Sequence, residues 1–197
     1  MNADAVRSAY DAVCAEAGPG VTVVAATKYV APQDMRILAD AGVAIAGENR
    51  AQDMQRKHAL HGDAFRWHFI GALQSNKARI VNEICELVHS LDSASAAKRL
   101  EIPALIQVNL AGEDTKSGVP PEALQELLDL YSDVRGLSTM PPFAEDPEES
   151  RPYFRKLREL AVEHGLTQLS MGTSQDYKVA AQEGATMIRI GSVLYQG

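Results

Sequence analysis

Short apolar runs alternate with helix-like segments along the whole chain, and this alternation is the strongest constraint on its fold. The runs are continuously apolar, which is typical of parallel strands that are buried on both faces. Parallel strands need long crossovers, and the segments between the runs have apolar residues at helical spacing. The runs cover residues 21–29, 43–49, 66–73, 86–93, 104–111, 134–142, 168–174 and 187–195.

Eight such units predict an α/β fold, a single (β/α)8 TIM barrel. An extra amphipathic helix is expected in residues 1–18, before the first strand. An open doubly wound sheet is the alternative, because both folds alternate strands and helices. The predicted crossover helices span residues 32–41, 49–60, 75–84, 94–100, 120–131, 147–164 and 175–183.

The length of the chain favours one domain over residues 1–197. At 197 residues, with 46% hydrophobic and 23% charged residues, the chain can form one well-packed core. A barrel of this length is short, because about 250 residues is typical. The connections must therefore be short, and the segment between the fourth and fifth strands, "ASAAKRLEIP", is predicted to be the tightest.

Charge and cysteine usage exclude several classes of protein. The 26 acidic and 19 basic residues give a formal charge of −7, which argues against nucleic-acid binding. No stretch approaches the roughly 18 apolar residues of a membrane span, and the N-terminus does not have the pattern of a signal peptide. Cys14 and Cys85 are far apart and lack metal-ligand spacing. We expect a cytoplasmic protein without a metal, and a monomer.

Polar residues recur where the predicted strands end. In a barrel of parallel strands, functional side chains come from the carboxyl ends of the strands. Lys28 ends the first run, Asn49 ends the second, and Arg189 lies in the eighth. Asparagine at a strand end is also a common turn or helix-cap residue. Lys28 is harder to explain as a structural residue, because the run before it is small and apolar.

Two segments near the C-terminus have the features of a phosphate site. "LSMGTSQDY" places Gly172 and Ser174 between a strand and a helix, and "IRIGSVLY" places Gly191 and Ser192 after the next strand. Backbone N–H groups and hydroxyls at such positions bind anions, and the loops after the last two barrel strands often bind phosphate. The two segments predict a phosphorylated ligand.

A lysine on the first strand that faces a phosphate site suggests a phosphorylated aldehyde. A partly desolvated lysine can add as a neutral amine to a carbonyl and form a Schiff base. Pyridoxal 5′-phosphate (PLP) has the required aldehyde and phosphate. A sugar phosphate of an aldolase has the same two features, so this reasoning leaves both ligands open.

Eight segments, in order and over nearly the whole chain, resemble the pyridoxal phosphate homeostasis proteins. The most specific are "WHFIGALQSNKAR", "LSMGTSQDY" and the C-terminal "RIG". The fold of this family is the barrel domain of alanine racemase standing alone, a fold-type III PLP-binding barrel. The other segments are "VVAATKYV", "AGENRAQD", "VHSLDS", "LIQVNLAGEDTKSG" and "RGLSTMPPF".

The resemblance implies a role for each matching residue. Lys28 is expected to hold PLP covalently as an internal aldimine, and Asn49 to lie near the cofactor ring. Ser170, Arg189, Gly191 and Ser192 are expected around the phosphate and the ring nitrogen. An arginine near the pyridine nitrogen would keep that nitrogen unprotonated and weaken the electron sink that carbanion chemistry requires.

The resemblance also implies a carrier and regulator of the PLP pool that affects amino-acid and keto-acid metabolism, without catalytic turnover. Racemases of this fold use a second acid–base group from an extra domain, and we expect none after Gly197. PLP-dependent apoenzymes are the expected partners. One alternative is a small racemase or lyase with Tyr177 or Tyr195 as a second base. A sugar-phosphate aldolase or isomerase is the other.

Overall fold

The strands of the protein form a closed parallel barrel in sequence order. The computed structural model describes residues 1–112 and 117–195. In this part of the chain β1 pairs with both β2 and β8, which excludes the open sheet and confirms the predicted (β/α)8 fold. The strands are β1 (Thr22–Ala26), β2 (Ile45–Glu48), β3 (Arg66–Phe69), β4 (Leu87–Leu91), β5 (Ala104–Gln107), β6 (Val134–Ser138), β7 (Gln168–Thr173) and β8 (Met187–Ile190).

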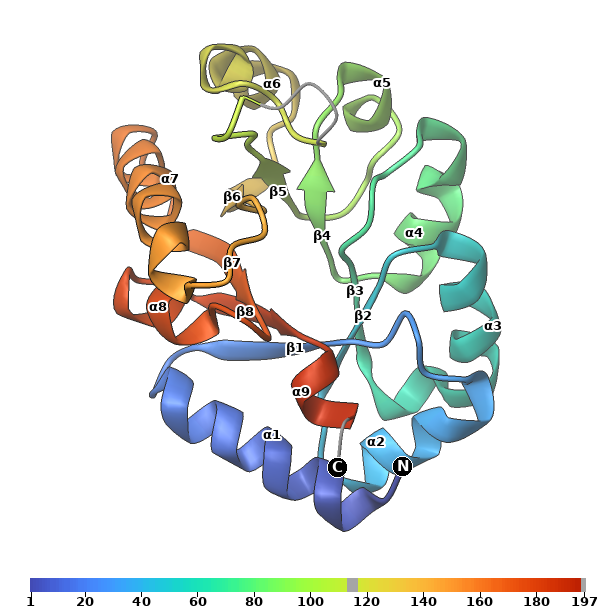
Figure 1. Cartoon of the computed structure of the whole chain (residues 1–197). Helices are drawn as coiled ribbons and strands as arrows, with labels where there is room; N and C mark the ends of the chain where they lie inside the picture. The colour runs from blue at the N-terminus through green and yellow to red at the C-terminus, as the bar shows by residue number, and fades with distance from the viewer. Residues whose placement is uncertain (113–116, 196–197) are drawn as a thin grey trace.

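Helices surround the barrel (Figure 1), and α1 is the predicted extra helix at the N-terminus. Short 3-10 turns precede α2, α4, α6 and α7: η1 (Pro32–Asp34), η3 (Ser75–Lys77), η4 (Pro121–Ala123) and η5 (Pro147–Ser150), and η2 (Gly62–Ala64) follows α3. The helices are α1 (Ala3–Ala17), α2 (Met35–Asp40), α3 (Ala51–His61), α4 (Ala78–Ile84), α5 (Ala94–Ala97), α6 (Leu124–Leu130), α7 (Arg151–Glu163), α8 (Tyr177–Gln182) and α9 (Ser192–Tyr195).

The end of the last predicted strand is wrong. The apolar run at residues 187–195 was expected to be one strand, but β8 ends at Ile190 and α9 follows it. The run stays apolar because Leu194 of α9 is 1% exposed and belongs to the core. The tight connection after β4 holds α5, which has only four residues.

Local sequence signals set the helix ends and their buried faces. In α1, the side chain of Asn2 accepts a hydrogen bond from the backbone N–H of Asp4 at 2.8 Å, which caps the helix. Gly18 ends α1 with φ +88°, a conformation that favours glycine. In α7, Phe154, Leu157 and Leu160 recur at helical spacing and are buried against the barrel.

Apolar residues fill the space between strands and helices, whereas part of the barrel interior is polar. The buried apolar cluster joins residues of α2, α3 and α7 to the strands. A smaller cluster holds Leu87, Leu105 and Met187. Polar side chains from β3, β4, β7 and β8 meet across the interior. His89 of β4 hydrogen-bonds both His68 of β3 and Ser170 of β7, and Arg189 of β8 also hydrogen-bonds Ser170. This polar interior adjoins the candidate site.

Candidate functional site

A cavity of about 720 Å³ lies at the carboxyl ends of the strands, where barrel enzymes place their chemistry. We call it the carboxyl-end cavity. It brings together residues that follow β1, β2, β7 and β8. Of the predicted site residues, Lys28, Asn49, Ser174, Arg189, Gly191 and Ser192 line it.

Lys28 lies in the turn after β1, two residues beyond the end of the strand. Its side chain is exposed, not partly desolvated as expected from the apolar run before it. The Nζ atom lies 4.9 Å from the centroid of the Tyr29 ring, a cation–π contact. The amine is therefore accessible from the cavity.

A buried ion pair anchors the turn that carries Lys28. Lys57 of α3 forms this pair with Glu48 of β2 and also donates to the backbone carbonyl of Thr27 at 2.7 Å. The Thr27 hydroxyl donates to Glu48 Oε1 at 2.5 Å. The role of Lys57 was not predicted from the sequence, because a lysine in an amphipathic helix is usually a solvated surface residue. The pair fixes the backbone immediately before Lys28.

Asn49 faces the cavity with an unsatisfied acceptor. Its side-chain oxygen, Oδ1, is buried and has no hydrogen-bond partner among the described residues. The backbone of Asn49 lies so close to Gly71 that a Cβ there would be 2.1 Å from the Asn49 carbonyl oxygen. Only glycine allows this approach of the two strand ends. A small turn of the Asn49 side chain would bring this shielded oxygen to a ligand in the cavity that donates a hydrogen bond.

Hydrogen bonds hold the buried cation Arg189 in a fixed position. Its Nη1 donates to the Ser170 carbonyl at 2.8 Å and to the Ser170 hydroxyl at 2.5 Å, while Nη2 donates to the Thr139 carbonyl at 2.9 Å. Burial lowers the pKa of Arg189 to about 10, which still leaves it charged at neutral pH. Arg189 is therefore a fixed donor at the wall of the cavity.

Ser170 does not line the cavity but lies beneath Arg189, and it continues a chain of hydrogen bonds through the barrel. His89 Nδ1 lies 2.7 Å from the Ser170 hydroxyl, and His68 Nδ1 lies 2.9 Å from His89 Nε2. Burial lowers the pKa of His68 to about 4 and that of His89 well below its usual value, so both rings are neutral. The place of His89 in this chain of hydrogen bonds was not predicted from the sequence, because its partners are distant in sequence.

The two predicted phosphate-binding segments meet at Ser174. The Ser174 hydroxyl oxygen accepts from the backbone N–H groups of Gly191 at 3.0 Å and Val193 at 3.5 Å. The hydroxyls of Ser174 and Ser192 lie beside these N–H groups at one side of the cavity, and an anion that displaced the Ser174 oxygen would meet both N–H groups. Such a cluster is suited to an anion.

Gly172 is placed differently from the other predicted residues. It does not line the carboxyl-end cavity, and its φ of +92° favours glycine. A Cβ at this position would lie 2.6 Å from the Cβ of Ala180 in α8. Its glycine is therefore explained by the packing of β7 against α8.

Neither tyrosine proposed as a second base is free to act as one. Tyr177 donates its hydroxyl to Glu16 of α1 and does not line the cavity. Tyr195 lines the cavity, but its hydroxyl donates to the Ala26 carbonyl at 3.2 Å. Burial raises the pKa of both hydroxyls, that of Tyr177 to about 12. Both side chains therefore stay protonated at neutral pH.

Comparison with known proteins identifies the family. The model for the N-terminal domain of alanine racemase matches residues 1–197. The pyridoxal phosphate homeostasis protein of Aquifex aeolicus is 42% identical, over 92% of this chain and 90% of its own length. That of Pseudomonas aeruginosa is 38% identical, over 89% of this chain and 83% of its own. The chain belongs to the pyridoxal phosphate homeostasis protein family.

Solved structures of relatives agree with this family. PipY of Synechococcus elongatus PCC7942, solved with and without PLP, is 32% identical and has a TM-score of 0.87. The similarity covers 96% of this chain and 99% of PipY. Alanine racemase of Clostridium difficile 630 matches with a TM-score of 0.80 at 14% identity, over 99% of this chain and 57% of the racemase. At that identity the racemase shows the fold alone.

Two further findings concern metal ligands and membrane-spanning helices. In residues 1–112 and 117–195, no three His, Cys, Asp or Glu side chains are grouped so that they could hold a metal ion. In the same part of the chain, no helix is long and apolar enough to span a membrane.

Proposed function

We propose that the protein binds PLP in the carboxyl-end cavity, covalently through Lys28, and takes part in PLP homeostasis. One observation carries this proposal. The cavity brings an accessible lysine amine, a buried arginine and a cluster of backbone N–H groups together at one barrel mouth. The names of the relatives and the PLP bound to PipY support the same ligand over a sugar phosphate.

The residues present fit PLP. Asn49 offers a buried acceptor without a partner, which suits the ring hydroxyl of the cofactor. The hydroxyls of Ser174 and Ser192 would donate to the phosphate, and the Gly191 N–H, which donates to the Ser174 oxygen in this structure, would turn to the phosphate when that oxygen is displaced. The cavity volume of about 720 Å³ is in the range of small-molecule sites. When bound, PLP supplies an aldehyde that condenses with amines and a ring that withdraws electrons.

The cavity residues have separate tasks in this proposal. Lys28 would hold the aldehyde carbon of PLP through Nζ, and the ion pair of Glu48 and Lys57 holds the turn of Lys28 in place. Arg189 would donate to the phosphate or to the ring nitrogen of PLP. A guanidinium group can only donate, so at the ring nitrogen it would keep that nitrogen without a proton. Binding without strong electron withdrawal suits a carrier better than a racemase.

The same arrangement disfavours the racemase alternative. Racemisation needs a base on each face of the cofactor, and the two tyrosines considered for this task donate their hydroxyls to Glu16 and Ala26. Burial raises the pKa of both tyrosines. We therefore propose no catalytic turnover.

Deuterium exchange and cofactor transfer together test this function. The PLP-loaded protein is incubated with single L-amino acids in deuterated water, and separately with a PLP-dependent apoenzyme. We expect PLP to pass to the apoenzyme and restore its activity, with no turnover-dependent deuteration at the α carbon. Deuteration that exceeds the amount of protein would favour the racemase. A protein that takes up no PLP would exclude both functions.

We further propose that the protein acts in the cytoplasm, as a monomer, and delivers PLP to apoenzymes. Cys14 and Cys85 are free thiols, which is typical of a reducing compartment. Size-exclusion chromatography with light scattering would test the monomer. A dimer at micromolar concentration would contradict it.

A further inference from the structure

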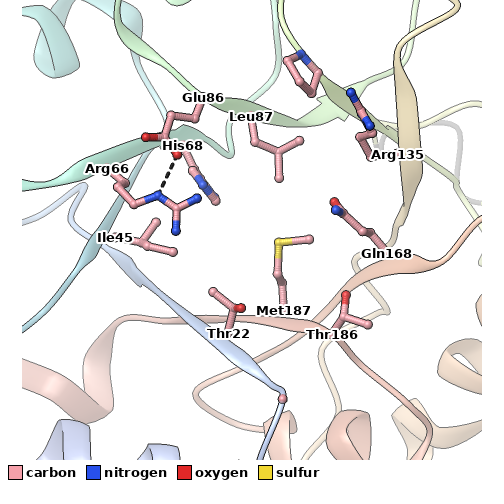
Figure 2. Close-up of a pocket in the computed structure, with 12 residues that line it drawn as sticks. Thr22, Ile45, Arg66, His68, Glu86, Leu87, Arg135, Gln168, Thr186 and Met187 are labelled. Carbon is pink, nitrogen blue, oxygen red and sulfur yellow. Dashed lines mark hydrogen bonds and ion pairs between the residues drawn. The ribbon is translucent and has the colours of Figure 1, made fainter.

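A second cavity, of about 400 Å³, lies at the opposite end of the barrel, where the strands begin. We call it the amino-end cavity. Figure 2 shows side chains from several strands around it, with Arg66 and Arg135 on different sides and the Gln168 amide pointing inward. This end of a barrel usually serves stability alone. The side chains here have unused hydrogen-bonding capacity, which stability does not explain.

The two arginines are only weakly committed to other partners. Arg66 pairs with Glu86 and Arg135 pairs with Asp133, both through Nε, at 2.7 and 2.6 Å. All four side chains are at least 40% exposed, and exposed ion pairs contribute about 0–1 kcal/mol. The terminal guanidinium nitrogens are therefore available to an anion that enters the cavity.

The hydrogen-bond chain through the barrel ends in a donor at this cavity. Arg189 can only donate, so the Ser170 hydroxyl oxygen accepts from it. Among the described residues, His89 Nδ1 is the acceptor available to the hydroxyl proton. His89 then donates through Nε2 to His68 Nδ1, which leaves the proton of the neutral His68 ring on Nε2. His68 lines the amino-end cavity and offers this N–H to it.

Gln168, which lines this cavity, has a side-chain acceptor without a partner among the described residues. The Gln168 side-chain oxygen is buried and has no hydrogen-bond partner in the part of the chain that the structure describes. Gln168 lines the cavity, so a small turn of its amide would bring this shielded oxygen to a ligand that donates a hydrogen bond. Leu87 and Met187 add apolar surface between these polar groups, which suits a short carbon skeleton.

We propose that the amino-end cavity binds a small carboxylate that carries a hydroxyl or amino group on the neighbouring carbon. The carboxylate contacts Arg66 and the N–H of His68, Arg135 adds positive charge from the other side of the cavity (Figure 2), and the hydroxyl or amino group donates to Gln168. Glu86, which also lines the cavity, stays paired with Arg66 through Nε. A volume of about 400 Å³ holds a ligand of this size. This site is separate from the PLP site and does not depend on the proposed function.

Calorimetry with L-lactate tests the site, because lactate has no amine that could react with PLP. We expect L-lactate to bind about tenfold more tightly than propionate, which lacks the hydroxyl that would pair with Gln168. Chloride at the same ionic strength should give no comparable heat. Equal binding of lactate and propionate, or no binding of lactate, would overturn the proposal.

Arginine variants locate the site. Arg66→Gln should weaken lactate binding about tenfold, because it loses a charged hydrogen bond. Arg135→Gln should weaken it less, because it removes only a nearby positive charge. The matched control is Arg79→Gln, which removes an exposed arginine of an ion pair on α4 and should leave the affinity unchanged. Circular dichroism verifies that each variant is folded. Unchanged affinity in both cavity variants would overturn the location.

Two further measurements separate this site from the carboxyl-end cavity. Lactate affinity should be the same before and after incubation with PLP, whether or not PLP binds. The nitrogen NMR signal of His68 Nε2 should shift on addition of lactate. Competition between lactate and PLP, or an unmoved His68 signal, would contradict binding at the amino-end cavity.

Discussion

At the scale of single residues, the carboxyl-end cavity combines fixed donors with one unused acceptor. Arg189 is held by the Ser170 and Thr139 carbonyls, which fix the direction of its guanidinium group. Asn49 Oδ1 has no partner among the described residues. A buried acceptor without a partner lowers the stability of the fold. We infer that this acceptor is retained for the ligand.

Replacing Asn49 by alanine should therefore affect binding and stability in opposite directions. Without PLP, Asn49→Ala should unfold with an unchanged or higher free energy, because an unpaired buried acceptor costs about 1–3 kcal/mol. Its affinity for PLP should fall about tenfold. Urea unfolding and a fluorescence titration with PLP measure the two effects.

Asn82 provides the matched control. Its side chain donates to the Arg99 carbonyl at 2.9 Å and accepts from the Glu101 N–H at 3.0 Å, and it does not line the carboxyl-end cavity. Asn82→Ala should lose stability and keep its PLP affinity. If Asn49→Ala behaves like this control, the role assigned to Asn49 is wrong.

At the scale of elements, the sequence predicts strands better than it predicts their ends and their polar contacts. Continuous apolar runs locate all of the strands, because strands covered on both faces have few polar positions. Apolar residues that follow a strand continue the run, so α9 was read as part of β8. Lys57 and His89 could not be found, because their partners lie on other elements. Lys28 and Arg189 were predicted from their places in the strand pattern and from the family resemblance, and both line the carboxyl-end cavity.

The ion pair between α3 and β2 should be a large contribution to stability. Lys57→Met leaves the buried Glu48 carboxylate without its cation, and breaking a buried pair in this way costs about 3–5 kcal/mol. The double variant Lys57→Met with Glu48→Gln should recover much of this loss. Urea unfolding of the single and double variants measures the coupling, and a loss below about 1 kcal/mol would contradict a tightly buried pair.

The contact between α7 and α8 should make stability depend on pH in acid. Glu183 accepts from Arg151 at 2.9 Å and also pairs with Arg155 and Arg158. The Arg151 hydrogen bond is the largest cause that lowers the pKa of Glu183 below its usual value. The stabilisation is therefore present above the ordinary glutamate pKa of about 4.3 and is lost as the pH falls below it.

Glu183→Gln isolates this contribution. The variant should be less stable than the parent by about 1–2 kcal/mol at neutral pH, because it loses charged hydrogen bonds. The difference should shrink as the pH falls below about 4. Urea unfolding at several pH values measures it, and a difference that does not change with pH would contradict the assigned cause.

At the scale of the whole molecule, barrel closure makes each strand depend on two neighbours. β1 and β8, from opposite ends of the chain, pair over four residues each. Because β1 pairs with both β2 and β8, unfolding of either end of the chain would open the barrel. We therefore propose that residues 1–197 form one domain.

This proposal predicts a single unfolding transition. Trp67 of β3 is the only tryptophan of the chain and is 2% exposed. Its fluorescence and the far-UV circular dichroism of the helices should change with the same midpoint in urea. Two separate midpoints would indicate parts that unfold independently.

The central claim is that Lys28 binds PLP covalently at the barrel mouth. The most direct test is to incubate the protein with PLP, reduce it with borohydride, digest it, and locate the added mass by mass spectrometry. Reduction converts an imine into a stable amine, so the label records which lysine held the cofactor. We predict a single pyridoxyl group on the peptide that contains Lys28. A label on another lysine, or on none, would contradict the account.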